Sequence, residues 1–127
     1  MKLVIGGYAQ GKLNYVLERN HSDGCIVWDG MLPHEAEPQG KMIVIDHFHS
    51  WVRERMKQNG NPEGEVAAFM EAHPECTIIS DEIGNGIVPV DGFEREYRER
   101  TGRILTKLAG QAEEVVRVIC GIGQKIK

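Results

Sequence analysis

Five short runs of apolar, mostly β-branched residues constrain the fold more than any other feature of the sequence. They are KLVIG (2–6), CIVW (25–28), MIVID (42–46), CTIIS (76–80) and EVVRVIC (114–120). Glycine, proline or polar residues bound each run, which is typical of β-strands. Their apolar character is nearly continuous, as expected for strands that helices cover on both faces. The sequence therefore predicts an α/β fold with a mostly parallel sheet.

Apolar residues recur with helical spacing in two segments between these runs, 64–73 and 91–110. The two stripes are Val66, Phe69, Met70 and His73, and Phe93, Tyr97, Ile104 and Leu108. Asp91 and Glu94 stand in the positions of a capping pair, and Gly110 lies near the expected end of the second helix. Strands that alternate with helices predict right-handed crossovers in a three-layer fold, with ligands at the carboxyl ends of the strands.

The last segment, GIGQKIK (121–127), is too short for another crossover, so we expect an antiparallel edge strand. A chain of 127 residues, 41% of them hydrophobic, fits a single phosphate-loop α/β domain over residues 1–127. The net charge of -4 argues against nucleic acid as a partner. No apolar run approaches the ~20 residues of a membrane span, which favours a cytoplasmic location. Buried, reduced thiols are expected at Cys25, Cys76 and Cys120.

A glycine-rich turn, GGYAQGK (6–12), joins the first strand to a helix and has the GxxxxGK spacing of a phosphate-binding loop. Such a loop wraps backbone N–H groups around phosphate oxygens, while its lysine neutralises the outer phosphates. The candidate nucleotide-binding residues are Gly6, Gly7, Tyr8, Ala9, Gln10, Gly11 and Lys12. The alternative is a strand-to-helix turn whose glycines only permit tight packing, with Lys12 in solvent.

Leu13 stands where a phosphate loop normally has a serine or threonine that binds magnesium. Leu13 shares a helical stripe with Val16 and Leu17, so we expect it to pack in the core. Nucleotide binding can survive this loss because the cradle is backbone, whereas phosphoryl or nucleotidyl transfer would lose charge stabilisation. The loop therefore predicts binding more strongly than turnover.

Asp46 ends an apolar strand, as the second metal-binding element of phosphate-loop proteins does. An equally weighted alternative is that Asp46 caps a helix over HSWVRERMKQ (49–58). His47 and His49, two residues apart, could share a face and approach a metal near Asp46.

Asp81 and Glu82 follow the fourth strand and precede the glycine-rich turn IGNGIVPVD (83–91). Carboxylates at this end of a strand face the expected ligand crevice, which favours a metal or ribose contact. The alternative is that the two side chains order the loop by hydrogen bonding.

With these motifs, the sequence resembles the adenosylcobinamide kinase / adenosylcobinamide-phosphate guanylyltransferase family of cobalamin biosynthesis. The resemblance is carried by VIGGYAQGK (4–12), SDEIGNGIVPVD (80–91) and TGRILTKLAGQAEEVVRVICGIGQKIK (101–127). It implies a phosphate-loop fold, often assembled as a homo-oligomeric trimer, that uses GTP or ATP with Mg²⁺.

The resemblance also implies phosphorylation of the aminopropanol hydroxyl of adenosylcobinamide, followed by GMP transfer through a guanylylated histidine. By position, the loop glycines and Lys12 would hold phosphates. Asp46 and Asp81 would lie near the metal, and Glu82 near the nucleotide.

The chain departs from the family at Leu13, where the family has serine, and at Leu105, where asparagine is typical. The segment that carries the family's acceptor histidine is shortened to DGMLPHEAEPQGK (29–41), in which His34 is the remaining candidate acceptor. Two functions stay open. One is a corrinoid kinase or guanylyltransferase, and the other is a catalytically impaired GTP-binding protein or scaffold that acts with a corrinoid-pathway partner.

Overall fold

A computed structural model of the chain describes residues 1–34, 40–83 and 90–127. Its strands are β1 (Lys2–Gly6), β2 (Cys25–Asp29), β3 (Met42–Asp46), β4 (Thr77–Asp81), β5 (Glu114–Ile119) and β6 (Ile122–Lys125). Its helices are α1 (Lys12–Asn20), α2 (Phe48–Lys57), α3 (Pro62–Ala72) and α4 (Gly92–Gln111), with a 3₁₀ turn η1 (Ser22–Gly24). The predicted strands and helices are confirmed, with ends that shift by one or two residues.

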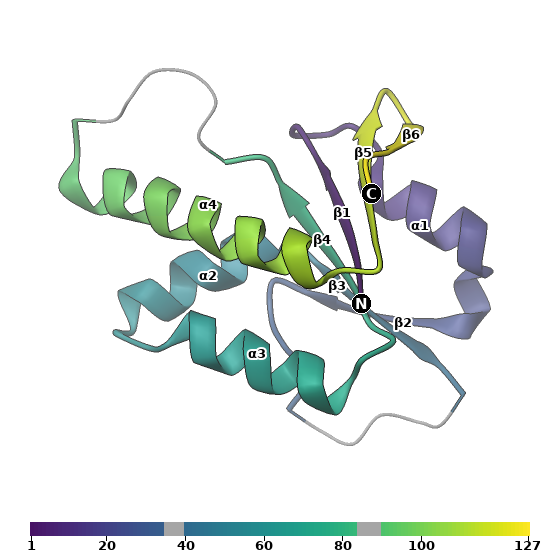
Figure 1. The fold of residues 1–127 in the computed structure, drawn as a ribbon, viewed down its shortest axis with the longest axis horizontal. Helices are drawn as coiled ribbons and strands as arrows, with labels where there is room; N and C mark the ends of the chain where they lie inside the picture. Colours follow the sequence, from purple (N-terminus) through teal and green to yellow (C-terminus); the bar gives the residue numbers. More distant parts are fainter. Residues whose placement is uncertain (35–39, 84–89) are drawn as a thin grey trace.

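The six strands form one sheet in the order β2-β3-β4-β1-β5-β6 (Figure 1). All neighbouring pairs are parallel except β5 and β6, which are antiparallel. Cys120 and Gly121 join these two strands with φ angles of 50° and 77°, as in the two-residue turns that suit the twist of a hairpin. The predicted mostly parallel α/β fold with a C-terminal antiparallel edge strand is therefore confirmed.

Both faces of the central strands are buried, and successive residues of these strands point to opposite faces. On one face, α2, α3 and α4 pack against a cluster that includes Leu3, Ile45 and Ile78. On the other face, α1 packs through Val16 onto a cluster that includes Val4. The three layers are visible in Figure 1. This two-sided burial explains why the strand sequences are apolar without alternation.

β1 and β4 lie side by side, but the helices that follow them, α1 and α4, lie on opposite faces of the sheet. A crevice forms at such a switch point, at the carboxyl ends of the strands. Gly6 and Asp81, the last residues of β1 and β4, are partners in the sheet register. The fold thus brings the glycine loop and the Asp81 carboxylate to the same place.

The start of α4 confirms part of its predicted capping. The Asp91 side chain accepts a hydrogen bond of 3.1 Å from the Glu94 amide. The Glu94 carboxylate does not return the contact but pairs with Arg53 of α2. At the other end, α4 continues through Gly110 to Gln111, so Gly110 lies in its last turn and does not terminate it.

The expectation for the cysteines needs correction, and the turn predicted over residues 83–91 falls mostly on residues that the structure does not describe. All three cysteines are free, but only Cys76 is buried, whereas Cys25 is half-buried and Cys120 is exposed on the hairpin turn. Among the helices of the described residues, none combines the length and the apolar character that a membrane span requires.

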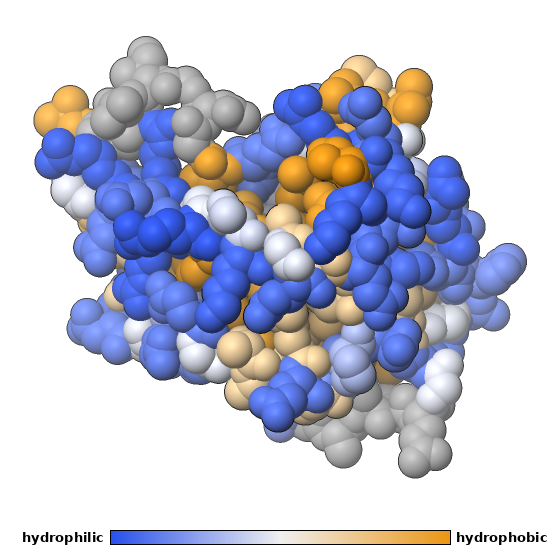
Figure 2. Space-filling model, in the orientation of Figure 1, coloured by the Kyte–Doolittle hydropathy of each residue, from blue (hydrophilic) through white to orange (hydrophobic). Residues whose placement is uncertain are grey.

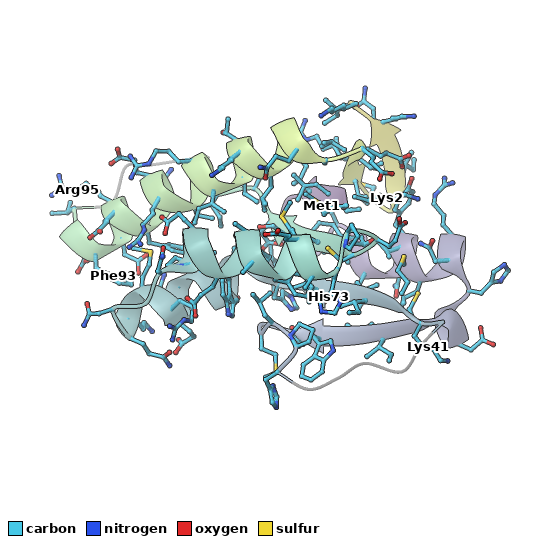
Figure 3. The ribbon with its side chains drawn as sticks, turned by 60° about the horizontal axis from the view of Figure 1, so that its bottom comes forward. Met1, Lys2, Lys41, His73, Phe93 and Arg95 are labelled. Carbon is cyan, nitrogen blue, oxygen red and sulfur yellow. The ribbon has the colours of Figure 1, made fainter. Side chains whose placement is uncertain are left out.

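The space-filling view and the view with side chains locate the two ends of the sheet (Figures 2 and 3). Figure 2 shows hydrophobic atoms over the β5–β6 hairpin, where Ile119 and Ile122 are exposed. In Figure 3, Lys2 and Lys41 mark the amino ends of β1 and β3, and Phe93 marks the start of α4. The residues of the predicted site lie at the opposite, carboxyl end of the strands.

Candidate functional site

The glycine loop between β1 and α1 presents unused backbone donors. Gly11 is the N-cap residue of α1 in a left-handed conformation, with φ at 85°, and Ala9 also has a positive φ of 54°. Within the described part of the chain, the Gln10 amide belongs to the turn over residues 8 and 9, and the other amides of residues 7–13 donate no hydrogen bond. Free amides at the start of a helix attract anions. The loop therefore keeps the donors that a phosphate cradle needs.

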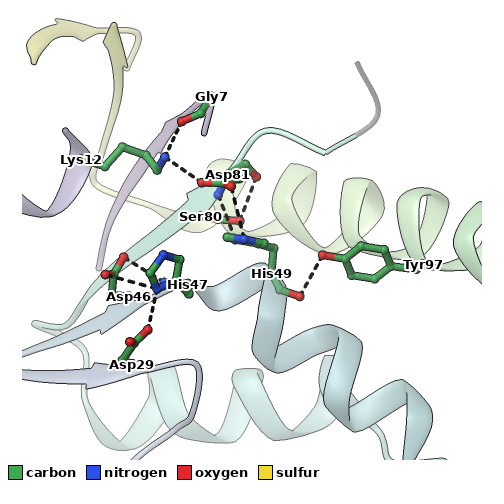
Figure 4. A network of polar contacts seen from close by, with 9 residues as sticks. All are labelled: Gly7, Lys12, Asp29, Asp46, His47, His49, Ser80, Asp81 and Tyr97. Carbon is green, nitrogen blue, oxygen red and sulfur yellow. Dashed lines mark hydrogen bonds and ion pairs between the residues drawn. The ribbon is translucent and has the colours of Figure 1, made fainter. Parts of the chain in front are cut away.

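Lys12 lies at this loop with its side chain directed inward. Its Nζ donates a hydrogen bond of 2.6 Å to the Gly7 carbonyl oxygen and lies 2.7 Å from Oδ1 of Asp81 (Figure 4). Lys12 is only 8% exposed. This contradicts the alternative in which Lys12 is solvated, because the charge is held between the loop and β4.

Gln10 ties the loop to the C-terminal hairpin. Its Oε1 accepts a hydrogen bond of 2.7 Å from the Cys120 amide, and its carbonyl oxygen accepts one of 2.8 Å from the Gly121 amide. Tyr8, by contrast, is 85% exposed. The Gln10 side chain therefore positions the loop, a role that the loop motif alone does not reveal.

His49 of α2 holds Asp81 from the side opposite to Lys12. Its Nδ1 accepts a hydrogen bond of 3.1 Å from the Asp81 amide, and its Nε2 lies 3.4 Å from Oδ2 of Asp81. Burial lowers the pKa of His49. The neutral ring therefore carries its proton on Nε2, facing Asp81. The Tyr97 hydroxyl donates to the His49 carbonyl oxygen over 3.1 Å and fixes the start of α2.

Asp46 and His47 lie one strand away, at the end of β3. His47 is the N-cap residue of α2, so the alternative in which Asp46 caps this helix is wrong. Asp46 Oδ1 instead accepts a hydrogen bond of 2.9 Å from the His47 amide. His47 Nδ1 lies 2.5 Å from Oδ1 of Asp29 and 3.5 Å from Oδ2 of Asp46. The hydrogen bond to Asp29 raises the pKa of His47.

The two histidines do not share one metal position. Their ring centroids are 5.8 Å apart with planes at 72°, and each ring faces a different carboxylate (Figure 4). His47 faces Asp29 and Asp46, whereas His49 faces Asp81. The expected pairing of His47 and His49 at a metal near Asp46 is therefore replaced by two separate histidine–carboxylate contacts.

Three further residues from the sequence analysis, Glu82, His34 and Leu13, make contacts outside the Lys12–Asp81 pair and the Asp46–His47 contact. Glu82 accepts two hydrogen bonds, of 2.6 and 3.0 Å, from the Arg117 guanidinium on β5. The His34 ring packs edge-on against Trp28 with centroids 5.3 Å apart. Leu13 is half-buried and packs against the cluster on the α1 face, which confirms its expected core role in part.

Sequence reasoning missed Asp29, which ends β2 as Asp46 ends β3. The two residues are partners in the parallel register, so their carboxylates emerge side by side. The signal was present in the sequence, because Asp29 directly follows the apolar run 25–28. Parallel pairing of the two runs would have predicted the contact.

The sheet order, the switch point and the loop before α1 define a phosphate-loop α/β protein. The chain belongs to the family described as cobinamide kinase / cobinamide phosphate guanyltransferase, whose sequence model matches residues 28–126. The matched range begins after the phosphate loop. The evidence for a role of residues 6–12 therefore comes from their geometry and not from the family match.

Two curated proteins are similar to this chain. The bifunctional adenosylcobalamin biosynthesis protein CobU of Escherichia coli K12 is 37% identical over 79 residues, which cover 61% of this chain and 44% of that protein. The protein of the same name from Salmonella typhimurium LT2 is 39% identical over 62 residues, which cover 49% of this chain and 34% of that protein. The chain thus spans less than half the length of the curated relatives it matches.

Proposed function

We propose that this chain binds the phosphates of GTP or ATP in the loop of residues 6–12. We further propose that it transfers phosphate or GMP to the aminopropanol group of adenosylcobinamide or its phosphate. Membership of the cobinamide kinase family supports the class of reaction. The observation that carries nucleotide binding is the set of free loop amides beside Lys12.

A triphosphate would accept hydrogen bonds from the loop amides and from Lys12 Nζ. These contacts would replace those that Lys12 makes with Gly7 and Asp81. Gln10 would keep the loop open through the hairpin, and neutral His49 would keep Asp81 oriented after Lys12 turns to the phosphates. Glu82, which the family resemblance puts near the nucleotide, would be held in position by its hydrogen bonds from Arg117.

Magnesium is the cation that the family resemblance implies for a bound nucleotide, and the residues fit it in part. Leu13 offers no oxygen, and both carboxylate oxygens of Asp81 face Lys12 or His49. Asp46 is the nearby carboxylate on the next strand. We propose that Asp46 and Asp81 hold the cation together with phosphate oxygens, where it would neutralise phosphate charge.

A second candidate function is nucleotide binding without turnover, in the service of a corrinoid-pathway partner or as an oligomeric scaffold. The packing of Leu13 favours this second function. Its side chain lies against the α1-face cluster and has no hydroxyl that could replace the metal-binding serine. The contact of His34 with Trp28 also favours it, because the acceptor role would require the ring to leave this packing.

Three further expectations accompany this proposal. The chain would act as one domain over residues 1–127, in the cytoplasm, and as a homo-oligomer, for which the family resemblance suggests a trimer. Sedimentation of the purified protein would test the oligomeric state directly.

Isothermal titration with GTP and with ATP tests nucleotide binding. The parent protein is expected to bind one nucleotide per chain. Lys12→Met retains the aliphatic stem and is expected to weaken binding about tenfold or more, because it removes a charge-assisted contact to phosphate. Lys57→Met removes an exposed lysine at the end of α2 and serves as the control. Equal affinities of parent and Lys12→Met would refute phosphate binding by this loop.

Labelled GTP incubated with adenosylcobinamide, or with its phosphate, separates the two candidate functions. A labelled corrinoid that forms with the parent and not with Lys12→Met would support the transferase. Saturable GTP binding with no labelled product at high protein concentration would support the binding protein.

A further inference from the structure

Asp29, Asp46 and His47 bring three ligand atoms together beside the phosphate loop, and the proposed function leaves Asp29 and His47 unused. One oxygen of each carboxylate and Nδ1 of His47 lie within 4.8 Å of one another (Figure 4). The carboxylates come from the ends of the neighbouring parallel strands β2 and β3. His47 follows β3 directly, so the strand register and the start of α2 together fix the cluster.

The Asp46 carboxylate provides a second, independent observation. Asp46 is only 7% exposed. Its Oδ1 accepts the His47 amide hydrogen, and its Oδ2 pairs with His47 Nδ1 at 3.5 Å, on a ring that Asp46 shares with Asp29. A buried carboxylate oxygen is costly unless a donor or a cation compensates its charge. Lys12 cannot compensate it, because its Nζ is engaged by Asp81 and Gly7.

We propose that Asp29, Asp46 and His47 form a binding site for a first-row divalent transition metal. An imidazole nitrogen with two carboxylate oxygens selects ions such as Mn²⁺, Co²⁺ or Zn²⁺ over Mg²⁺, which prefers oxygen ligands. The side chains of Asp29 and His47 are 70% and 50% exposed, so further coordination positions would open to solvent. The site shares Asp46 with the proposed magnesium position but needs no nucleotide to form.

The present spacing shows what the metal would displace. Two ligands bound tetrahedrally at about 2.0–2.1 Å lie about 3.4 Å apart. His47 Nδ1 and Asp29 Oδ1 are 2.5 Å apart, at hydrogen-bonding distance. Metal binding would therefore remove the shared proton and move the exposed Asp29 side chain outward by about 1 Å. Asp46 would not need to move, because its Oδ2 already faces Nδ1.

Titration of chelator-treated protein with Mn²⁺, without nucleotide, tests the site by calorimetry and electron paramagnetic resonance. One Mn²⁺ per chain is expected, with a ¹⁴N coupling from imidazole. Asp29→Asn and His47→Gln are each expected to weaken binding at least tenfold, and His47→Gln is expected to abolish the nitrogen coupling. Mg²⁺ is expected to compete only at concentrations at least tenfold higher.

Asp23→Asn and His73→Gln are matched controls, because each alters the same residue type outside the cluster, and both are expected to bind Mn²⁺ like the parent. Thermal unfolding without metal would verify that each variant is folded. The proposal is overturned if Mn²⁺ does not bind, if the cluster variants bind it like the controls, or if Mg²⁺ competes equally. Because no nucleotide is present, these outcomes are independent of the proposed function.

Discussion

Lys12, the first residue of α1, and Asp81, the last residue of β4, form an ion pair with Nζ 2.7 Å from Oδ1. Both side chains are largely buried, so the pair is shielded from solvent. The same lysine is the charge that a phosphate loop offers to its ligand. Asp81 and a nucleotide therefore compete for the Lys12 ammonium group. A substitution that removes the Asp81 charge should lower the stability of the fold but raise the affinity for nucleotide.

Asp81→Asn is expected to lower the free energy of unfolding by about 1–3 kcal/mol without nucleotide, because it leaves Lys12 without its carboxylate partner. In the presence of a chelator, the same variant is expected to bind GTP several-fold more tightly, because phosphate no longer displaces a carboxylate. Chemical unfolding and calorimetry measure the two effects. Glu99→Gln, which removes an exposed carboxylate of α4, controls for net charge. Weaker GTP binding by Asp81→Asn would contradict the competition.

Leu13→Ser tests how packing and metal binding conflict at one position. The leucine packs against the α1-face cluster, so its truncation is expected to destabilise the fold by about 1–3 kcal/mol. The new hydroxyl is expected to make GTP binding depend more strongly on Mg²⁺. Leu13→Met is the control, because it nearly preserves volume and adds no oxygen. An unchanged Mg²⁺ dependence in Leu13→Ser would show that the loop does not place this residue at the metal.

Gly6→Ala tests the close approach of the loop to β5. An added methyl group would lie 2.5 Å from the Val118 carbonyl oxygen, so the strands must separate. We expect a loss of about 1–3 kcal/mol in the free energy of unfolding, as for other overpacked sites. Gly102→Ala meets no atom within 4 Å in α4 and is expected to stabilise the protein by about 0.5–1 kcal/mol. Equal stabilities of the two variants in urea would be inconsistent with this packing.

The pair of Glu63 and Arg100 predicts a pH dependence of stability. Two hydrogen bonds from the guanidinium, of 2.6 and 2.9 Å, lower the pKa of Glu63. A lowered folded-state pKa contributes stability that is fully present above the unfolded pKa and is lost as the pH falls through the folded value. Because the Glu63 side chain is 40% exposed, we expect a contribution below about 1 kcal/mol.

Urea unfolding of the parent protein and of Glu63→Gln between pH 7 and pH 3 measures the contribution of this pair to the free energy of unfolding. The stability difference is expected to be greatest near neutral pH and to shrink as the pH drops below about 4. A difference that stays constant over this range would show that the ion pair does not couple to folding.

The strands, the helices and the loop were predictable because each depends on local sequence. The apolar runs fixed the strands, and the position of GGYAQGK between a strand and a helix fixed the loop. The inward stripe that contains Leu13 likewise follows from helical spacing. Asp46 and Asp81 were predicted to face a crevice because both end apolar strands, and both lie at the carboxyl edge.

What could not be predicted depends on which strands are neighbours. The contact of Glu82 with Arg117 requires β5 beside β1, and the contact of Asp29 with His47 requires β2 beside β3. Short apolar runs do not encode that order. The His47 backbone is left-handed, with φ at 52°, and the rings of His47 and His49 meet edge-on while each faces a different carboxylate. A positive φ is uncommon for residues other than glycine, and although histidine is among the residues enriched there, the sequence does not mark which histidine adopts it.

The central claim is that the amides of the loop converge on the phosphates of a nucleotide. A two-dimensional ¹H–¹⁵N spectrum of the labelled protein, titrated with GTP, tests it directly. We predict that the Gly7, Gly11 and Lys12 amide signals shift the most, while the Gly102 signal in α4 stays in place. Loop signals that remain unchanged at millimolar GTP would contradict the claim.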